Sequence, residues 1–186
     1  MAIMWLFIAW SFSWPAVFHD MTRQVLKHGQ GLGYVKTYDL DVDGILGQYC
    51  LSSQTTFYII TDWLIITTEQ LEKKRKILLD RLYKELVGIK QELSEGKLGC
   101  HHKCRSMMLG SLMLEKASHR DLPLEDQDDY SNLALFRFVT MVNNFRPIDW
   151  YTDHYNRPHL CNPKLSMQPV INEITKDLMV KLSDFQ

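Results

Sequence analysis

The feature that most constrains this chain is an amphipathic segment between Thr67 and Glu95. Its apolar residues recur at intervals of three, four or seven positions, which gathers them on one stripe of an α-helix, whereas a strand would scatter them over both faces. The stripe consists of Leu71, Leu78, Leu82, Leu86, Ile89 and Leu93. Asp80 stands four positions before Lys84, a spacing that stabilises an exposed helix face. The segment therefore predicts a helix of about eight turns that needs a partner for its apolar stripe.

The start of this helix has two alternative positions. Thr67 followed by Gln70 has the pattern of a capping box, which would begin the helix there. Residues 57–66, FYIITDWLII, are rich in β-branched and aromatic side chains, which taken alone are typical of a strand, but they run directly into the helical pattern. We favour one helix that reaches back to about Thr55 and packs against the N-terminal hydrophobic segment. Gly96 and Gly99 predict where it ends.

Length and composition indicate an ordered domain. The chain has 186 residues, of which 46% are hydrophobic and 23% charged, so it can bury a core of its own and is not expected to be disordered. Residues 61–120 carry 12 basic against 8 acidic side chains. Because the two signs alternate along the predicted helix, this excess indicates a solvated face, and we expect no nucleic-acid partner.

The first 18 residues have no charged side chain and contain three of the five tryptophans. Three interpretations compete. A membrane anchor would be slightly shorter than the ~20 residues that usually span a bilayer. A signal peptide cut after Ser13 would lack the usual positive start, and a segment buried in a soluble protein would need a deep groove. We favour the anchor, which places the protein at a membrane of an organelle or the endomembrane system. Secretion is the alternative.

The fold class expected from these patterns is mainly α. Residues 1–19 form the anchor or signal segment, residues 20–53 a glycine-rich joint with an acidic turn, and residues 54–186 a helical domain. Apolar spacing predicts three shorter helices, at 106–116, 130–142 and 166–185, which form a small bundle with the long helix. The first of these should be a buried helix filled by methionines.

An acidic stretch, DLDVDGILGQYC, offers a possible calcium site. Its alternating carboxylates and the glycine at its sixth position match the first part of an EF-hand loop, but its twelfth position is Cys50 rather than a glutamate. The ligands would be Asp39, Asp41, Asp43 and the carbonyl of Ile45. The stretch also resembles the DxDG motif of haloacid-dehalogenase-type phosphatases, which implies Asp41 as nucleophile and Asp43 as acid and base. That family has a parallel sheet, for which this chain lacks strands. We favour an acidic turn.

Cysteines and histidines offer a possible zinc site. The segment CHHKC supplies two cysteines four positions apart, and DHYNRPHLC supplies further ligands later in the chain. The candidate ligands are Cys100, Cys104, His154, His159 and Cys161. The spacing superficially resembles the CX3C of small intermembrane-space proteins, without the second pair. The alternatives are two disulfides among the four cysteines of the chain in an oxidising compartment, or thiols in a reducing one.

The segment between Arg146 and Pro163 is typical of a recognition loop, since prolines separate aromatic, histidine and arginine side chains. The residues expected to contact a partner are Trp150, Tyr151, Tyr155 and Arg157. No serine lies in a nucleophile-elbow motif. The expected function is therefore that of a non-catalytic, membrane-anchored helical protein, an accessory or scaffolding subunit of a larger assembly. The alternatives are a secreted, disulfide-bonded helical binding protein and a metal-dependent enzyme that uses the DxDxDG segment.

Overall fold

The computed structural model describes residues 2–30, 54–119, 130, 133–144, 161–178, 180 and 182–185. These residues contain helices and no strand, which confirms the mainly α fold. The α-helices are α1 (Ala2–Ser11), α2 (Pro15–His28), α4 (Gln54–Glu95), α5 (His102–Ser118), α6 (Leu135–Asn143) and α7 (Pro163–Asp177), followed by the short 3-10 helix η3 (Leu182–Phe185).

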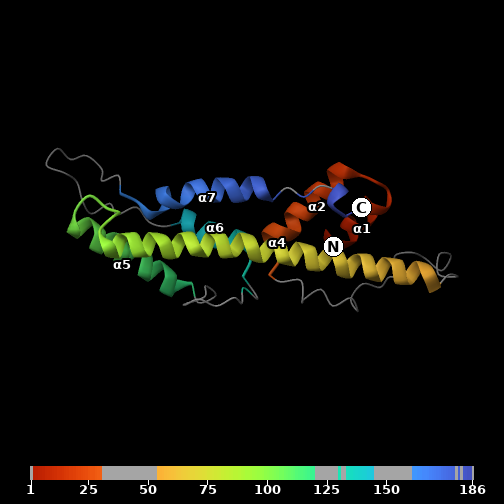
Figure 1. Ribbon diagram of the computed structural model, residues 1–186, viewed down its shortest axis with the longest axis horizontal. Helices are drawn as coiled ribbons and strands as arrows, with labels where there is room; N and C mark the ends of the chain where they lie inside the picture. Colours follow the sequence, from red (N-terminus) through yellow and green to blue (C-terminus); the bar gives the residue numbers. More distant parts are fainter. Residues whose placement is uncertain are drawn as a thin grey trace.

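Helix α4 is the axis of the molecule. Its 42 residues make a rod of about 63 Å, along which the other helices lie (Figure 1). It begins at Gln54, so the single-helix alternative is confirmed and a start at Thr67 is wrong, since Thr67 lies inside the helix with its side chain buried. The predicted stripe from Leu71 to Leu93 is buried along its whole length. The helix ends as predicted, because Gly96 and Gly99 adopt the left-handed φ angles of 80° and 92° that favour glycine.

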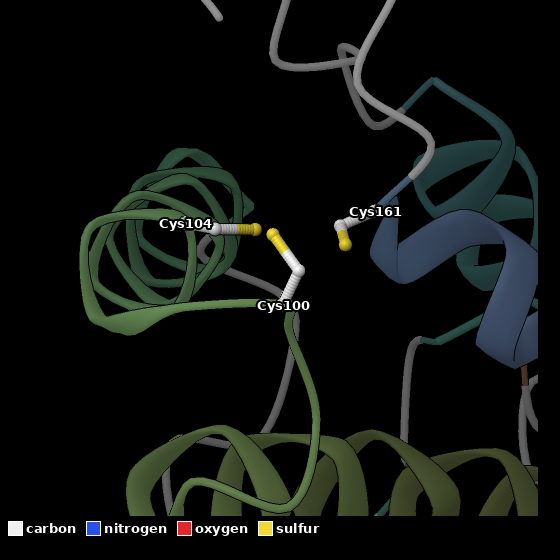
Figure 2. Close-up of side chains that lie close together, drawn as sticks. All are labelled: Cys100, Cys104 and Cys161. Atoms are coloured by element: carbon white, nitrogen blue, oxygen red, sulfur yellow. The ribbon is translucent and has the colours of Figure 1, made fainter. Parts of the chain in front are cut away.

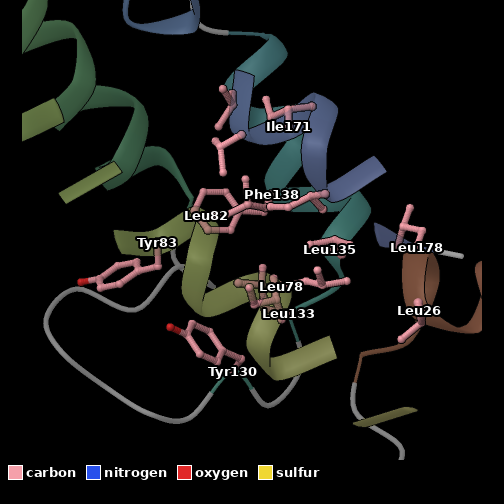
Figure 3. Packing of buried hydrophobic residues seen from close by; sticks show 14 of the residues in the cluster. Leu26, Leu78, Leu82, Tyr83, Tyr130, Leu133, Leu135, Phe138, Ile171 and Leu178 are labelled. Carbon is pink, nitrogen blue, oxygen red and sulfur yellow. The ribbon is translucent and has the colours of Figure 1, made fainter. Parts of the chain in front are cut away.

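The core lies where α6 and α7 pack on the middle of α4. Helix α7 runs beside α4, and α6 contacts α2, α4 and α7 (Figure 1). Leu78 and Leu82 of α4 meet Phe138 of α6 and Ile171 of α7 in this layer, as Figure 3 shows. Burying each such side chain stabilises the fold by about 1.5–3 kcal/mol. The bundle predicted from the apolar stripes is therefore present, with α4 as the shared partner.

The N-terminal segment forms two helices rather than one. The break comes at residues 12–14, where Ser13 has a φ of 52°, and Pro15 opens α2 at a position where its missing N–H costs nothing. Leu6 and Ala9 of α1 are buried, and the ring centroid of Trp10 lies 4.9 Å from that of Trp63 on α4. The expected packing of the upper part of α4 against this segment is confirmed.

Within the described part of the chain, no helix combines the length and the apolar character that crossing a bilayer requires.

The shorter helices differ in detail from the prediction. Helix α5 buries only one stripe, formed by Cys104, Met108 and Leu112, while Met113 and Leu114 are 45% and 74% exposed. The prediction of a buried helix filled by methionines is therefore wrong for α5. Helix α7 ends at Asp177 instead of continuing to residue 185, and the chain resumes helical structure only in η3.

Candidate metal centre and an exposed aromatic corner

Two of the candidate zinc ligands are positioned by the turn that follows α4. The left-handed glycines reverse the chain, so that Cys100 stands in the turn and Cys104 in the first turn of α5. The Arg105 guanidinium donates a hydrogen bond of 3.0 Å to the carbonyl oxygen of Gly96, which closes this turn. The backbone N–H of Cys104 donates to Nδ1 of His101 at 3.1 Å, so the imidazole caps the helix.

The third ligand arrives from the far end of the sequence. Cys161 stands two residues before α7, in front of the cap Asn162, whose side-chain oxygen accepts a hydrogen bond of 2.9 Å from the backbone N–H of Lys164. Pro163 occupies the first position of the helix. This arrangement fixes where α7 begins and directs Cys161 toward the start of α5.

The three sulfur atoms converge, and all lie within 4.8 Å of one another. Figure 2 shows the side chains of Cys100 and Cys104 pointing toward each other, with Cys161 facing them from the start of α7. No disulfide joins any two of the three. Cys104 is buried, Cys161 is half-buried and Cys100 is exposed, so the cluster sits at the edge of the core.

The electrostatic environment of the cluster combines opposing effects. Burial raises the pKa of the Cys104 thiol to about 12; a backbone hydrogen bond from Cys100 opposes this rise, and the neighbouring thiols of Cys161 and Cys100 add to it. Its sulfur donates to the Met108 sulfur at 3.7 Å. The N-termini of α5 and α7 both lie at the cluster, and their dipoles favour negative charge there. A sulfur-binding cation deprotonates the thiols that it binds, and the negative charge of the resulting thiolates would match these dipoles.

The other predicted site residues lie outside the described part of the chain. This applies to the two histidines of the zinc set, His154 and His159, to the calcium set, and to the partner-contact set. The calcium set is Asp39, Asp41, Asp43 and Ile45, and the partner-contact set is Trp150, Tyr151, Tyr155 and Arg157. All of these remain predictions.

A second feature was missed by the sequence analysis, which treated residues 1–18 as one continuous segment. The corner between α1 and α2 leaves Phe12 and Trp14 66% and 48% exposed, with their ring centroids 5.5 Å apart. Trp5 on α1 is 46% exposed. We call Phe12 and Trp14 the aromatic corner. The proline at position 15, directly after the alternating small and aromatic residues of positions 11–14, is the sequence signal for the break.

A cavity of about 300 Å³ along α6 was also not expected from the sequence. Its lining includes His119, Phe136, Arg137 and Thr140.

Comparison of the chain with models of known protein families, with curated proteins and with solved structures finds no match. Its function is therefore inferred from its own residues and their geometry.

Proposed function

We propose that this protein is a non-catalytic accessory or scaffolding protein that attaches to a membrane surface through the aromatic corner and offers α4 to a protein partner. The observation that carries the proposal is the exposure of Phe12 and Trp14, side by side, in a stretch of 18 residues without a charged side chain. Large aromatic side chains exposed together are unfavourable in water and favourable at the headgroup level of a bilayer.

The packing of α1 supports attachment to a surface. The ten residues of α1 make about 15 Å of helix, half of the ~30 Å hydrocarbon thickness of a bilayer. One side of the helix is held in the core through Leu6 and Ala9. Trp5 on α1 and the corner remain exposed, and aromatic side chains of this kind lie at the membrane interface. The packed helices α1 and α2 hold the corner in place, so little conformational entropy is lost when its side chains insert into a bilayer.

The exposed side of α4 supports contact with a protein partner. Ile66 and Ile77 are 54% and 57% exposed, and their spacing of eleven residues places them on the same side of the helix. Between them the helix carries charged side chains such as Lys73, which is exposed. A long, straight helix with isolated apolar anchors in a charged face is typical of helix-to-helix recognition.

The test is binding of the full chain to neutral phosphatidylcholine vesicles, measured by co-sedimentation. We expect the double variant Phe12→Ser/Trp14→Ser to lose at least about tenfold in partition, since each lost aromatic anchor is worth roughly 1.5–3 kcal/mol when fully buried. The matched control is Leu165→Ser on α7, which removes a side chain that is 60% exposed away from the corner. Failure of the unmodified protein to bind vesicles, or an equal loss in the control, would contradict membrane attachment.

A further inference from the structure

We propose that Cys100, Cys104 and Cys161 bind one zinc ion as thiolates, in a structural site that joins the turn after α4 to the starts of α5 and α7. This inference does not depend on membrane attachment, since the cysteines and the aromatic corner lie in different parts of the fold.

The distances suit a tetrahedral zinc ion. Zinc–sulfur bonds of about 2.3 Å place the sulfur ligands of one ion ~3.8 Å apart. The three sulfur atoms lie within 4.8 Å of one another, so they need to move by about 1 Å or less to bind one ion. Cys100 stands in an exposed turn and Cys161 in the coil before α7, and both can make this adjustment by side-chain rotation.

The donor set selects the metal. Among the residues that the structure describes, the group consists of sulfur ligands alone, which favours zinc over the calcium and magnesium ions that prefer oxygen. Three thiolates and a divalent cation carry a net charge of −1, and the N-termini of two helices compensate that charge. Zinc also takes a fourth ligand, which in sites with three cysteines is commonly a histidine.

The position of the site indicates a structural role. The ion would connect Cys100 and Cys104 to a residue 57 positions beyond Cys104 (161 − 104), and so would close a long loop. Closing such a loop removes conformational freedom from the unfolded chain, so metal binding stabilises the folded state. Cys104 is 1% exposed, which leaves no open side at that ligand for a substrate.

A disulfide is the alternative chemistry for these three sulfur atoms. One bond between two of these cysteines leaves the third thiol unpaired within the cluster, whereas one zinc ion binds all three. The two chemistries are distinguished by alkylation without reductant after metal removal, followed by intact mass. Alkylation of all four cysteines of the chain supports the zinc site, and protection of two by a disulfide overturns it.

The decisive experiment measures zinc in the purified full chain by atomic spectrometry. We expect one ion per chain, lost to background in Cys100→Ser, Cys104→Ser and Cys161→Ser. The matched control is Cys50→Ser, which removes the one cysteine that the proposed site does not use and should retain the zinc. Cys161→His, which restores a zinc ligand, should also retain it. Retention of full zinc by Cys104→Ser would overturn the site.

A second measurement uses the unmodified sequence, so its result does not depend on whether a serine variant folds. The unmodified protein is stripped of metal under reducing conditions, its helix content is checked by circular dichroism, and Co²⁺ is added. We expect the visible bands of tetrahedral cobalt together with sulfur-to-cobalt charge transfer, and their loss when Zn²⁺ is added. A folded, reduced protein that shows no such bands would overturn the proposal.

Discussion

Arg75 brings a charge into the core of this helical protein. Its side chain is 1% exposed, and its guanidinium donates to the carbonyl oxygens of Leu133 at 2.6 Å and Tyr130 at 3.2 Å. The Glu72 carboxylate accepts two further hydrogen bonds, at 2.6 and 2.9 Å. The guanidinium therefore fixes the chain before α6 against α4 by satisfying carbonyl groups that no helix pairs.

The sequence could not predict this role of Arg75. An arginine within an apolar stripe is expected to extend its charged end to water, and the carbonyl groups that hold it come from residues 55 and 58 positions away. The apolar positions around it were predictable because they depend on helical spacing alone. The burial of a charge depends on partners that only the folded chain brings together.

Replacing Arg75 with methionine should destabilise the protein by about 2–4 kcal/mol, because the hydrogen bonds that the guanidinium donates to the Glu72 carboxylate and to two carbonyl oxygens are all lost. Urea unfolding followed by circular dichroism measures the change. Arg81→Met is the matched control on the same helix. Arg81 is 42% exposed and pairs with Glu173 and Asp177 of α7, so its loss should cost less than about 1 kcal/mol. Equal losses of stability in the two variants would show that the buried Arg75 contributes no more stability than the exposed Arg81.

At the scale of the element, the end of α4 was easier to predict than its start. Glycine at positions that need a positive φ is a local signal, and Gly96 and Gly99 ended the helix as expected. The residues before Thr67 have low helix propensity, and Thr67 with Gln70 matches a cap. Packing decided against that cap, since Trp63 contacts the rings of Phe7 and Trp10 from within the helix. Propensity is a weak guide where tertiary contacts are strong.

Two glycines at the C-terminal end of α4 should respond to alanine with opposite signs. Gly88 lies within the helix with open space around the missing Cβ, so Gly88→Ala should stabilise the protein by about 0.5–1 kcal/mol. Gly96 has a positive φ and its missing Cβ position is occupied by the Arg105 guanidinium, so Gly96→Ala should destabilise it by roughly 1 kcal/mol or more. Thermal unfolding of both variants checks the pair. A stabilising Gly96→Ala would contradict the turn geometry.

At the scale of the whole molecule, the parts of the proposed metal site were predictable and their assembly was not. The three cysteines were among the candidate zinc ligands because of their residue type and the four-residue spacing of Cys100 and Cys104. That Cys161 reaches this pair depends on α7 packing along α4 with its start beside α5 (Figure 1). No spacing pattern in the sequence predicts that arrangement of helices. The corner at Phe12 likewise follows from how α1 folds back on α2 and α4.

Removal of the proposed zinc should loosen one part of the molecule only. After treatment with a chelator under reducing conditions, amide hydrogen exchange should become faster at the starts of α5 and α7, by about tenfold for each 1.4 kcal/mol of lost local stability. The α1–α2 pair should keep its rates, because its contacts with α4, such as that of Trp10 with Trp63, do not involve the three cysteines. Exchange read out by mass spectrometry of peptides separates the two regions. A uniform increase would mean that the metal supports global rather than local stability.

The length of α4 also determines how the molecule moves in solution. A compact sphere of this chain length would have a radius of gyration of about 16 Å and hence a diameter of ~41 Å, whereas α4 alone extends for about 63 Å. Rotation about the axis of α4 meets less friction than end-over-end rotation, so tumbling is anisotropic. Most backbone N–H bonds of α4 are parallel to that axis and are reoriented mainly by the slower rotation. Their nuclear spins therefore lose coherence sooner than those of bonds that lie across the axis.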